Sequence, residues 1–219
     1  MQLLRAFILS LIFAVAFGVV ALFISQQKLA NFDKSIIDFI RNFESSFLTK
    51  VMKGFSWIGS AEVVLILVLV LMVVLYKVLK HRLELFLLVG VVAGSGLLNV
   101  LLKLIFQRAR PDLHRIVDAT GFSFPSGHSM GAFTLYGIIA FLIWKHLSTP
   151  FRRVSVIVLS LIMIITIGVS RIYLGVHYPS DILGGYLASG MWLAIAIWWY
   201  QRYLERRAAH KHAPRSELE

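Results

Sequence analysis

Residues 170–181 read Ser-Arg-Ile-Tyr-Leu-Gly-Val-His-Tyr-Pro-Ser-Asp and separate two long apolar runs of the chain. Two more polar stretches also border apolar runs: Lys-Leu-Ile-Phe-Gln-Arg-Ala-Arg-Pro at residues 103–111 and Pro-Ser-Gly-His at residues 125–128. We call these three stretches the polar islands. They gather ionisable side chains at the edges of segments that otherwise carry few charges. Because such residues are costly at membrane depth, their presence there favours a functional role.

The apolar runs around the islands indicate an all-α integral membrane protein. Hydrophobic residues make up 58% of the 219-residue sequence and charged residues only 15%. Apolar stretches of about 18 or more residues are typical of transmembrane helices. We expect six such helices, at Leu4–Ser25, Trp57–Tyr76, Leu83–Phe106, Ser126–Trp144, Val154–Ser170 and Ile182–Tyr200. The first run is too long for the apolar core of a typical signal peptide, so we interpret it as a spanning helix.

These helices are expected to form one domain, with an extra segment between the first and the second. Residues 1–203 make up the six-helix membrane domain, and residues 204–219 form a basic C-terminal tail. The segment Phe32–Phe55 has apolar residues at helical spacing with charged residues between them. This pattern predicts one or two amphipathic helices in the membrane interface. The segment is either a connector packed on the bundle or a flank that guides lipid tails.

The number of spans places all three islands on one side of the membrane. The first island ends the third span, the second begins the fourth, and the last joins the fifth to the sixth, so this holds for either orientation. The loops on the side of the termini carry slightly more Lys and Arg than the others. Because basic residues favour the cytoplasmic side, we expect a cell-membrane protein with both termini in the cytoplasm and the islands on the extracytoplasmic face.

The composition also limits the ligands that the chain can use. Its net charge is +11. We interpret this excess of basic residues as serving contact with anionic lipid head groups and membrane topology rather than the binding of nucleic acid. The sequence has no cysteine, which excludes disulfides, a thiolate nucleophile and a cysteine metal site. It also lacks a cluster of carboxylates of the kind that binds magnesium. We therefore predict that the chain needs no metal and no cofactor.

Three cationic side chains of the islands, Lys103, Arg110 and Arg171, are suited to holding an anion. A single cation at a membrane edge often reaches toward the head groups, but three cations on one face repel one another unless an anion lies between them. Arginine donates forked hydrogen bonds to phosphate oxygens, and lysine adds a point charge. Ser126 is a suitable N-cap for the fourth span and Gly127 permits close approach of the backbone, so this helix start is a second anion-binding element.

Two histidines and one carboxylate supply the groups for attack on that anion. Asp181 follows His177 by four residues, and a carboxylate against an imidazole keeps one ring nitrogen protonated and leaves the other as a nucleophile. The residue before a proline disfavours the helical conformation. We therefore expect a turn at Pro179 to bring Asp181 to His177. His128 is then available as the general acid for the leaving oxygen and as the base for water.

The combined spacing of the islands resembles the three-part signature of the type 2 phosphatidic acid phosphatase superfamily. Lys-x6-Arg-Pro, Pro-Ser-Gly-His and Ser-Arg-x5-His-x3-Asp are all present without departure. The chain is similar to the membrane branch, which implies a six-helix core and metal-independent activity on lipid phosphates. The resemblance implies that His177 forms a phosphohistidine, that Asp181 orients it and that His128 protonates the leaving group. The residues implied to hold the phosphate oxygens are Lys103, Arg110, Ser126, Gly127 and Arg171.

The resemblance is nearest to small bacterial lipid phosphatases. It implies phosphatidylglycerophosphate, phosphatidic acid or undecaprenyl pyrophosphate as the substrate. Two other functions fit the same residues: a lipid-to-lipid phosphotransferase, and a non-catalytic protein that binds or transports anionic lipids. Pure binding needs the cations but has no use for an oriented His177–Asp181 pair and a second histidine. Vanadate-dependent oxidases share these residues among the relatives of the family, but an apolar six-span chain favours a lipid substrate.

Overall fold

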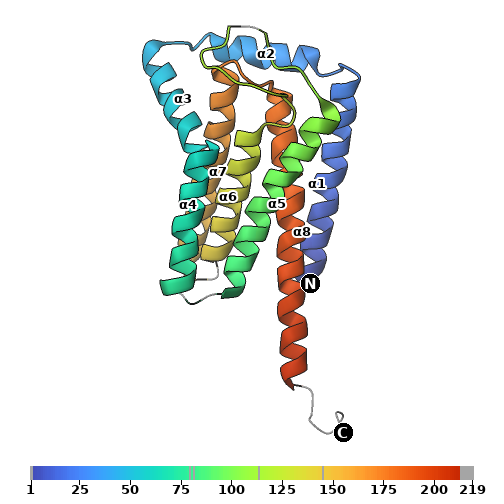
Figure 1. The fold of residues 1–219 in the computed structure, drawn as a ribbon, viewed down its shortest axis with the longest axis vertical. Helices are drawn as coiled ribbons and strands as arrows, with labels where there is room; N and C mark the ends of the chain where they lie inside the picture. The colour runs from blue at the N-terminus through green and yellow to red at the C-terminus, as the bar shows by residue number, and fades with distance from the viewer. Residues whose placement is uncertain (1, 79, 81, 113, 145, 213–219) are drawn as a thin grey trace.

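The computed structural model describes residues 2–78, 80, 82–112, 114–144 and 146–212, and these residues form an all-helical protein (Figure 1). The helices in chain order are α1 (Gln2–Ser25), α2 (Ala30–Arg41), α3 (Ser46–Ile58), α4 (Ala61–Val73), the π-helix η1 (Val74–Val78), α5 (Arg82–Phe106), α6 (Gly127–Trp144), α7 (Pro150–Tyr173) and α8 (Pro179–His212). No β-strand occurs in these ranges. The all-α class predicted from the sequence is therefore confirmed.

The described helices provide five or six membrane spans. Five of them, α1, α5, α6, α7 and α8, are long and apolar enough to cross a membrane by themselves. A sixth span results if α3 is counted together with α4 and η1, and these two parts are bent by 51° at their junction. The chain is thus an all-helical membrane protein, and its α5 and α6 begin and end within one residue of the predicted third and fourth spans.

The second predicted span, Trp57–Tyr76, differs from the structure at its start. The helical conformation is interrupted between α3 and α4. Here the Ser60 hydroxyl caps α4 by accepting a hydrogen bond from the N–H of Val63 at 3.4 Å. Gly59 lies against α7, and a Cβ atom at this position would be only 2.5 Å from Cγ2 of Ile167. The break therefore combines a helix cap with a close approach that needs glycine. The mean hydropathy of the predicted span does not indicate where this break between α3 and α4 lies.

The segment Phe32–Phe55, predicted to be amphipathic, forms most of α2 and α3. α2 crosses one end of the bundle, and α3 leads from it down to α4 (Figure 1). α2 buries Ile37 and leaves Phe39 exposed. α3 packs on α7, and the hydroxyl of Tyr173 at the end of α7 lies 2.8 Å from Oγ1 of Thr49. These contacts hold α2 and α3 over the ends of the helices that carry the third island.

The largest hydrophobic cluster lies among α4, α5, α6 and α8. Leu88 of α5 and Leu135 and Ile138 of α6 are fully buried in it. Trp192 of α8 donates a hydrogen bond from Nε1 to the carbonyl oxygen of Val91 at 3.0 Å, which joins α8 to α5. Large apolar side chains on the outer faces of α1, α4, α5 and α7 are exposed. An exposed apolar surface of this extent is typical of helices that face lipid.

The polar islands lie together at one end of the bundle, next to α2. α5 ends there, α6 begins there, and the turn from α7 to α8 is at the same end, whereas the N-terminus of α1 is at the other end (Figure 1). α8 continues beyond the bundle at that other end (Figure 1). The basic tail predicted at residues 204–219 is therefore helical over residues 204–212. Residues 213–219 lie outside the described residues.

Candidate active site

His177 and Asp181 meet at the start of α8. Pro179 is the first residue of this helix, a position where its missing N–H costs nothing and its fixed φ suits the helical turn. Oδ2 of Asp181 accepts a hydrogen bond from the backbone N–H of Tyr178 at 2.8 Å, as the acidic residue of a capping box does. The same oxygen lies 3.4 Å from Nδ1 of His177. The turn at Pro179 is thus the N-terminus of a helix, and its capping geometry brings the carboxylate to the imidazole.

His177 is a buried and neutral imidazole. Its removal from water lowers its pKa to about 4, an effect that Asp181 opposes and Arg110 reinforces. Nε2 of His177 lies 3.1 Å from Nη1 of Arg110, and a guanidinium only donates hydrogen bonds. Nε2 therefore presents its lone pair, and the ring proton is on Nδ1, facing Asp181. This tautomer makes Nε2 the candidate nucleophile.

Arg110 is fixed by backbone carbonyl groups of two loops. Its Nε donates to Gly121 at 3.0 Å and its Nη2 to Thr120 at 2.9 Å, both in the loop between α5 and α6. Its Nη1 donates to the carbonyl oxygen of Val176 at 2.9 Å. Three carbonyl partners hold the guanidinium group in place beside Nε2 of His177. A cation held in this way is ready for an anion that approaches the imidazole.

Arg171 presents an unsatisfied donor in the same region. It lies in the last turn of α7 and is only 6% exposed. Its Nη1 donates to the hydroxyl of Ser56 in α3. Its Nε is buried and has no hydrogen-bond partner among the described residues. A buried charged donor without a partner is costly, and an anion bound beside it would supply the missing acceptor.

Lys103 and His128 complete the predicted cationic site. Lys103 is in the last turn of α5, and His128 is in the first turn of α6. His128 is close enough to interact electrostatically with Lys103, Arg110, Arg171 and His177. The structure therefore brings residues of all three islands into one site with two histidines and three cations.

Ser126 and Gly127 form the start of α6 beside this site. Ser126 is fully buried, and its Oγ accepts hydrogen bonds from the hydroxyl of Ser129 at 3.2 Å and from the N–H of Ser129 at 3.4 Å. Its own N–H donates to the backbone carbonyl of Asp181 at 3.1 Å. The N-terminus of α6 is thus tied to the N-terminus of α8, and both helix starts point into the same region.

A largely apolar cavity of about 460 Å³ reaches His128 from between three helices. Val64 and Leu65 of α4, Val92 of α5 and Gly131 of α6 are among the residues that line it. Polar atoms are few along its walls, so the cavity suits an apolar ligand with one polar end. That polar end would lie at His128.

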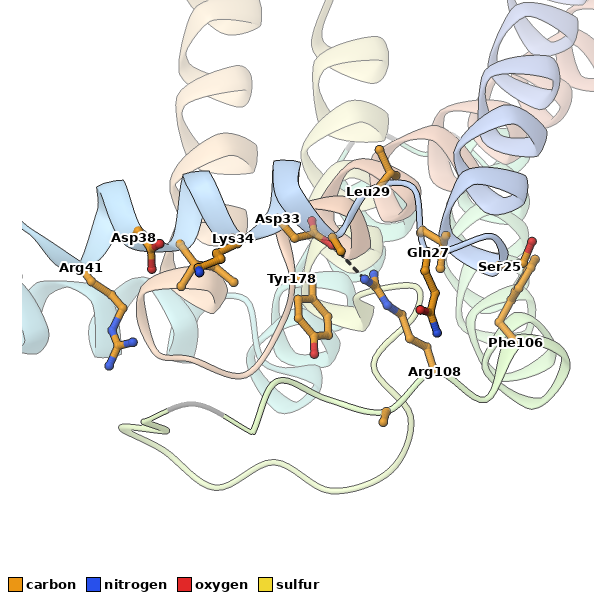
Figure 2. A pocket seen from close by; sticks show the side chains of 14 residues that line it. Ser25, Gln27, Leu29, Asp33, Lys34, Asp38, Arg41, Phe106, Arg108 and Tyr178 are labelled. Carbon is orange, nitrogen blue, oxygen red and sulfur yellow. Dashed lines mark hydrogen bonds and ion pairs between the residues drawn. The ribbon is translucent and has the colours of Figure 1, made fainter.

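The sequence patterns do not single out Arg108, which the structure places in the site. Its Nη1 donates to Oδ1 of Asp181 at 2.6 Å, and its Nη2 donates to Oδ2 of Asp33 at 2.8 Å (Figure 2). Its guanidinium carbon also lies 4.2 Å from the centre of the Tyr178 ring, within the range of a cation–π contact. The signal in the sequence is its position inside the first island, between the two expected cations.

Asp33 of α2 is the second residue that the sequence patterns leave out. It is only 2% exposed, whereas the other charged side chains of α2 are exposed. Its Oδ1 accepts from the N–H of Ser180 at 2.8 Å and its Oδ2 from the Ser180 hydroxyl at 2.7 Å. Asp33 precedes the buried Ile37 by one helical turn, so an acidic residue on the apolar face of an amphipathic helix is the signal that marks it.

Known proteins are similar to this chain in sequence. A family model described as the PAP2 superfamily matches residues 84–205. Phosphatidylglycerophosphatase B of Bacillus subtilis (strain 168) is 36% identical over 143 residues, which cover 64% of this chain and 69% of that protein. A lipid A 1-phosphatase of Rhizobium johnstonii is 36% identical over 114 residues, which cover 48% of this chain and 42% of that protein.

A solved structure shows the same fold. The crystal structure of a transmembrane PAP2-type phosphatidylglycerolphosphate phosphatase from Bacillus subtilis matches with a TM-score of 0.77 and 28% sequence identity, over 89% of this chain and 96% of that one. The region matched by the family model includes all three polar islands and more than half of the chain. The resemblance inferred from the spacing of the islands is therefore confirmed, and the chain belongs to the PAP2 superfamily.

Proposed function

We propose that this chain is a membrane phosphatase that hydrolyses lipid phosphates, with His177 as the nucleophile. The observation that carries the proposal is the state of the imidazole, which is neutral, has Nδ1 against Asp181 and has Nε2 facing Arg110. The relatives, named as a phosphatidylglycerophosphatase and a lipid A 1-phosphatase, support the reaction and the class of substrate.

In the first step, Nε2 of His177 attacks phosphorus, and the bond between phosphorus and the leaving oxygen breaks. The product is a phosphohistidine. Lys103, Arg110 and Arg171 stabilise the charge on the phosphoryl oxygens. One of these oxygens is the acceptor that the buried Nε of Arg171 lacks in the described part of the chain. The imidazole becomes cationic during attack, and Asp181 balances that charge through the hydrogen bond from Nδ1.

The start of α6 supplies the remaining phosphate contacts. The backbone N–H of Gly127 and the positive end of the helix dipole favour an anion at this position. The hydroxyl oxygen of Ser126 accepts hydrogen bonds from Ser129, so its own proton is available for a phosphate oxygen. Both residues thus contribute to the phosphate site as neutral donors.

His128 acts first as a general acid and then as a general base. It protonates the leaving oxygen as the phosphohistidine forms. In the second step it takes a proton from water, the water oxygen attacks phosphorus, and the bond between phosphorus and Nε2 breaks. Inorganic phosphate leaves, and His177 returns to its neutral form. The place of His128 at the end of an apolar cavity suits a leaving oxygen that carries a lipid.

The cavity at His128 also supports the choice of a lipid substrate. With about 460 Å³ between α4, α5 and α6, it accommodates part of the apolar leaving group but not a whole lipid. We propose phosphatidylglycerophosphate as the substrate, with phosphatidic acid and undecaprenyl pyrophosphate as related lipid phosphates. The name of the Bacillus relative supports the first choice.

We further propose that α3, α4 and η1 form one bent span, which gives six spans within a domain of residues 1–203, with α2 in the membrane interface. Both termini are then cytoplasmic and the site is extracytoplasmic. Because the chain has no cysteine, single cysteines report its orientation. With a membrane-impermeant maleimide on intact cells, we expect labelling of Lys34→Cys on α2 and no labelling of Arg152→Cys at the start of α7. The reverse pattern contradicts this orientation.

The experiment that tests the function compares three lipids and two histidine variants. Phosphate release is measured in detergent with EDTA from phosphatidylglycerophosphate, phosphatidic acid and undecaprenyl pyrophosphate. We expect His177→Ala to lose more than about 10⁴-fold in kcat, as nucleophile removal does, and to form no acid-labile phosphoenzyme. His114→Ala is the matched control, since His114 is an exposed histidine at the same end of the bundle that contacts Glu44 at 3.4 Å.

Each alternative function has its own outcome in this assay. Phosphate release by His177→Ala at the rate of the unmodified protein contradicts the nucleophile. Phosphate recovered on an added lipid rather than in water indicates a phosphotransferase. Lipid binding without turnover indicates a binding or transport protein. The described residues contain no group of three or more His, Asp or Glu side chains arranged to hold a metal, and activity lost in EDTA but restored by magnesium would contradict the metal-independent mechanism.

A further inference from the structure

The carboxylate that orients the proposed nucleophile has one arginine as its paired cation. Asp181 is fully buried, and His177, which its Oδ2 faces, is neutral. Among the described residues, Arg108 is the only Lys or Arg that forms an ion pair with Asp181, with Nη1 at 2.6 Å from Oδ1. A buried carboxylate without a paired cation tends to take up a proton. Arg108 therefore supports the ionised form of Asp181, together with the hydrogen bonds that Oδ2 accepts.

Arg108 also determines how the carboxylate is turned. The two oxygens of Asp181 have separate partners. Oδ1 is bound by Arg108, whereas Oδ2 accepts from the hydroxyl of Ser123 and from the N–H of Tyr178 and faces Nδ1 of His177. With Oδ1 held, Oδ2 stays directed at the imidazole. Loss of the guanidinium would leave Oδ1 without its donor and free the carboxylate to rotate.

Arg108 is held in turn by the interfacial helix α2. Its second nitrogen, Nη2, donates to Oδ2 of Asp33, and both side chains lie at the wall of a cavity of about 610 Å³ (Figure 2). The side chain of Arg108 is 19% exposed and that of Asp33 only 3%. The cavity gives the guanidinium room to turn away from Asp181 if Asp33 no longer binds it. The ion pair with Asp33 therefore limits the motion of Arg108.

Asp33 has a second contact that also helps to fix the position of Asp181. Its two oxygens accept hydrogen bonds from the N–H and the hydroxyl of Ser180, the residue immediately before Asp181. A carboxylate at a helix N-terminus is stabilised by free N–H groups and by the helix dipole. Asp33 thus caps α8 from a different helix, and it holds both the backbone before Asp181 and the arginine that binds its side chain.

We propose that Arg108 and Asp33 are positioning residues of the phosphatase reaction, which hold Asp181 in the ionised and oriented form that directs the tautomer of His177. The inference rests on the proposed role of His177 as the nucleophile. It adds α2, which lies outside the three islands, to the parts of the chain that control the chemical step. It predicts an effect on the formation of the phosphohistidine and none on the binding of the substrate.

The test uses the full-length protein in detergent and phosphatidic acid as substrate. Arg108→Lys replaces a fork that serves two carboxylates by a single ammonium group, and Asp33→Asn removes the charge that holds the fork. We expect each variant to lose about 10- to 100-fold in kcat, as is typical when the partner of a site residue is removed, with KM unchanged. Asp38→Asn is the matched control, because Asp38 is an exposed acidic residue of the same helix at the same cavity. It should keep the kcat of the unmodified protein.

Two further measurements distinguish positioning from a purely structural role. The rate of phosphoenzyme formation in a single turnover should fall in parallel with kcat. The acid limb of the pH profile of this rate, where the rate declines as the pH falls, should lie at higher pH in Arg108→Gln than in the unmodified protein. The reason is that loss of the positive charge paired with Asp181 makes protonation of that carboxylate easier. A purely structural role would lower the melting temperature and the amount of active protein without moving that limb. In Asp33→Asn/Arg108→Lys, the loss should be no greater than the larger single loss, as expected of residues that act as a unit.

The outcomes separate this inference from the proposed function. If His177→Ala is inactive while Arg108→Lys and Asp33→Asn keep a normal kcat and a normal acid limb, the positioning role is overturned and the nucleophile stands. If His177→Ala retains turnover, the proposed function itself fails. Where the Arg108 variants do not fold, Asp33→Asn decides, since Asn retains an acceptor for Ser180 and both Arg108 and Asp181 remain in the chain. A lowered kcat with unchanged KM then supports the proposal, and a normal kcat overturns it.

Discussion

Two arginines of the candidate site, Arg108 and Arg171, differ in how far their hydrogen-bond donors are satisfied by the protein. On the Nδ1 side of His177, Arg108 donates to Asp181 and to Asp33, so that one cation is shared by two buried carboxylates. In Arg171, at the end of α7, the buried Nε has no hydrogen-bond partner in the part of the chain that the structure describes. Two arginines at the same end of the bundle therefore differ: one holds the protein's own anions, and the other keeps a donor that an anion from outside would satisfy.

This difference shows that a count of charges does not identify a phosphate site. Arg108 lies only two residues from Arg110 in the first island, yet it serves carboxylates. A buried cation that is paired with carboxylates already has its counter-charge, whereas one with an unmatched donor has capacity for an anionic ligand. The hydrogen-bond partners of each cation, rather than its charge, separate the closed side of the site at Arg108 from its open side at Arg171.

Among the substitutions on the open side, replacement of His128 is expected to have the largest effect. If His128 protonates the leaving oxygen, His128→Ala should lower the kcat for phosphatidic acid by about 10²- to 10⁴-fold, the usual contribution of a general acid. The kcat for undecaprenyl pyrophosphate should fall less, because a phosphate leaving group depends less on protonation than an alkoxide does. Both rates are measured on the same preparation. Equal losses on the two lipids would contradict the role of general acid.

Arg171→Lys tests the unmatched donor directly. The change replaces a forked donor by a point charge, and we expect kcat to fall by about 10²- to 10³-fold, as it does when a donor to a transition-state oxyanion is lost. Orthovanadate should raise the melting temperature of the unmodified protein and of Arg108→Lys, but not of Arg171→Lys.

Arg115→Lys controls for the exchange itself, since Arg115 is an exposed arginine at the same end of the bundle. If vanadate stabilises Arg171→Lys as much as the unmodified protein, the open side has been misassigned. If vanadate no longer stabilises Arg108→Lys, Arg108 also contributes to binding an external anion.

The pH dependence tests the imidazole between the two sides. Burial lowers the pKa of His177 to about 4, so the nucleophile stays neutral as the pH falls until it approaches that value. An imidazole with the ordinary pKa near 6.5 would be only about 3% neutral at pH 5 and would react about 30-fold more slowly there. We expect the single-turnover rate of phosphoenzyme formation to change little between pH 7 and pH 5.

The same lowered pKa affects stability in a direction that follows from linkage. Between pH 6.5 and about 4 the unfolded chain takes up a proton at His177 that the folded chain does not, so the folded state loses stability as the pH falls through this window. His177→Gln lacks the titrating group and should lose less stability over the same range. Parallel unfolding curves for the two proteins would place the imidazole in a more hydrated environment.

The smallest expected effect is that of Ser126→Ala. Loss of the cap of α6 should lower the free energy of unfolding by about 1 kcal/mol, and kcat should fall less than in Arg171→Lys because the backbone donors remain. Ser45→Ala is the matched control, since Ser45 caps α3 through the N–H of Leu48 at 3.2 Å, outside the three islands. A loss of kcat in Ser126→Ala as large as that in Arg171→Lys would make the hydroxyl a principal phosphate ligand.

Local patterns in the sequence predict much of this protein. Hydropathy identifies the long apolar helices, and the alternation of spans places the three islands at one end. The approach of Asp181 to His177 also follows from spacing, because four residues around a proline at a helix start leave few conformations. The bend at Gly59 is not predictable in this way, since it depends on how closely α7 approaches.

The remaining parts of the site depend on contacts between distant residues. Asp33 and Arg108 are 75 positions apart, and nothing near either residue in the sequence indicates the other. The tautomer of His177 is set by Arg110, which reaches it from the loop between α5 and α6. A sequence can therefore indicate which residues bind an anion, but the groups that orient those residues become visible only when the helices are packed.

The cap that Asp33 provides for α8 has a consequence for how the protein is made. It joins residues 147 positions apart, and chains are synthesised from the N-terminus onward. A growing chain that has passed the second island already carries Lys103, Arg110 and His128 but not yet His177, the proposed nucleophile. Asp33 and Arg108 have no Asp181 to hold until α8 has been synthesised and inserted. On the proposed mechanism, we therefore expect the protein to be inert toward the lipids around it until its last helix has been inserted.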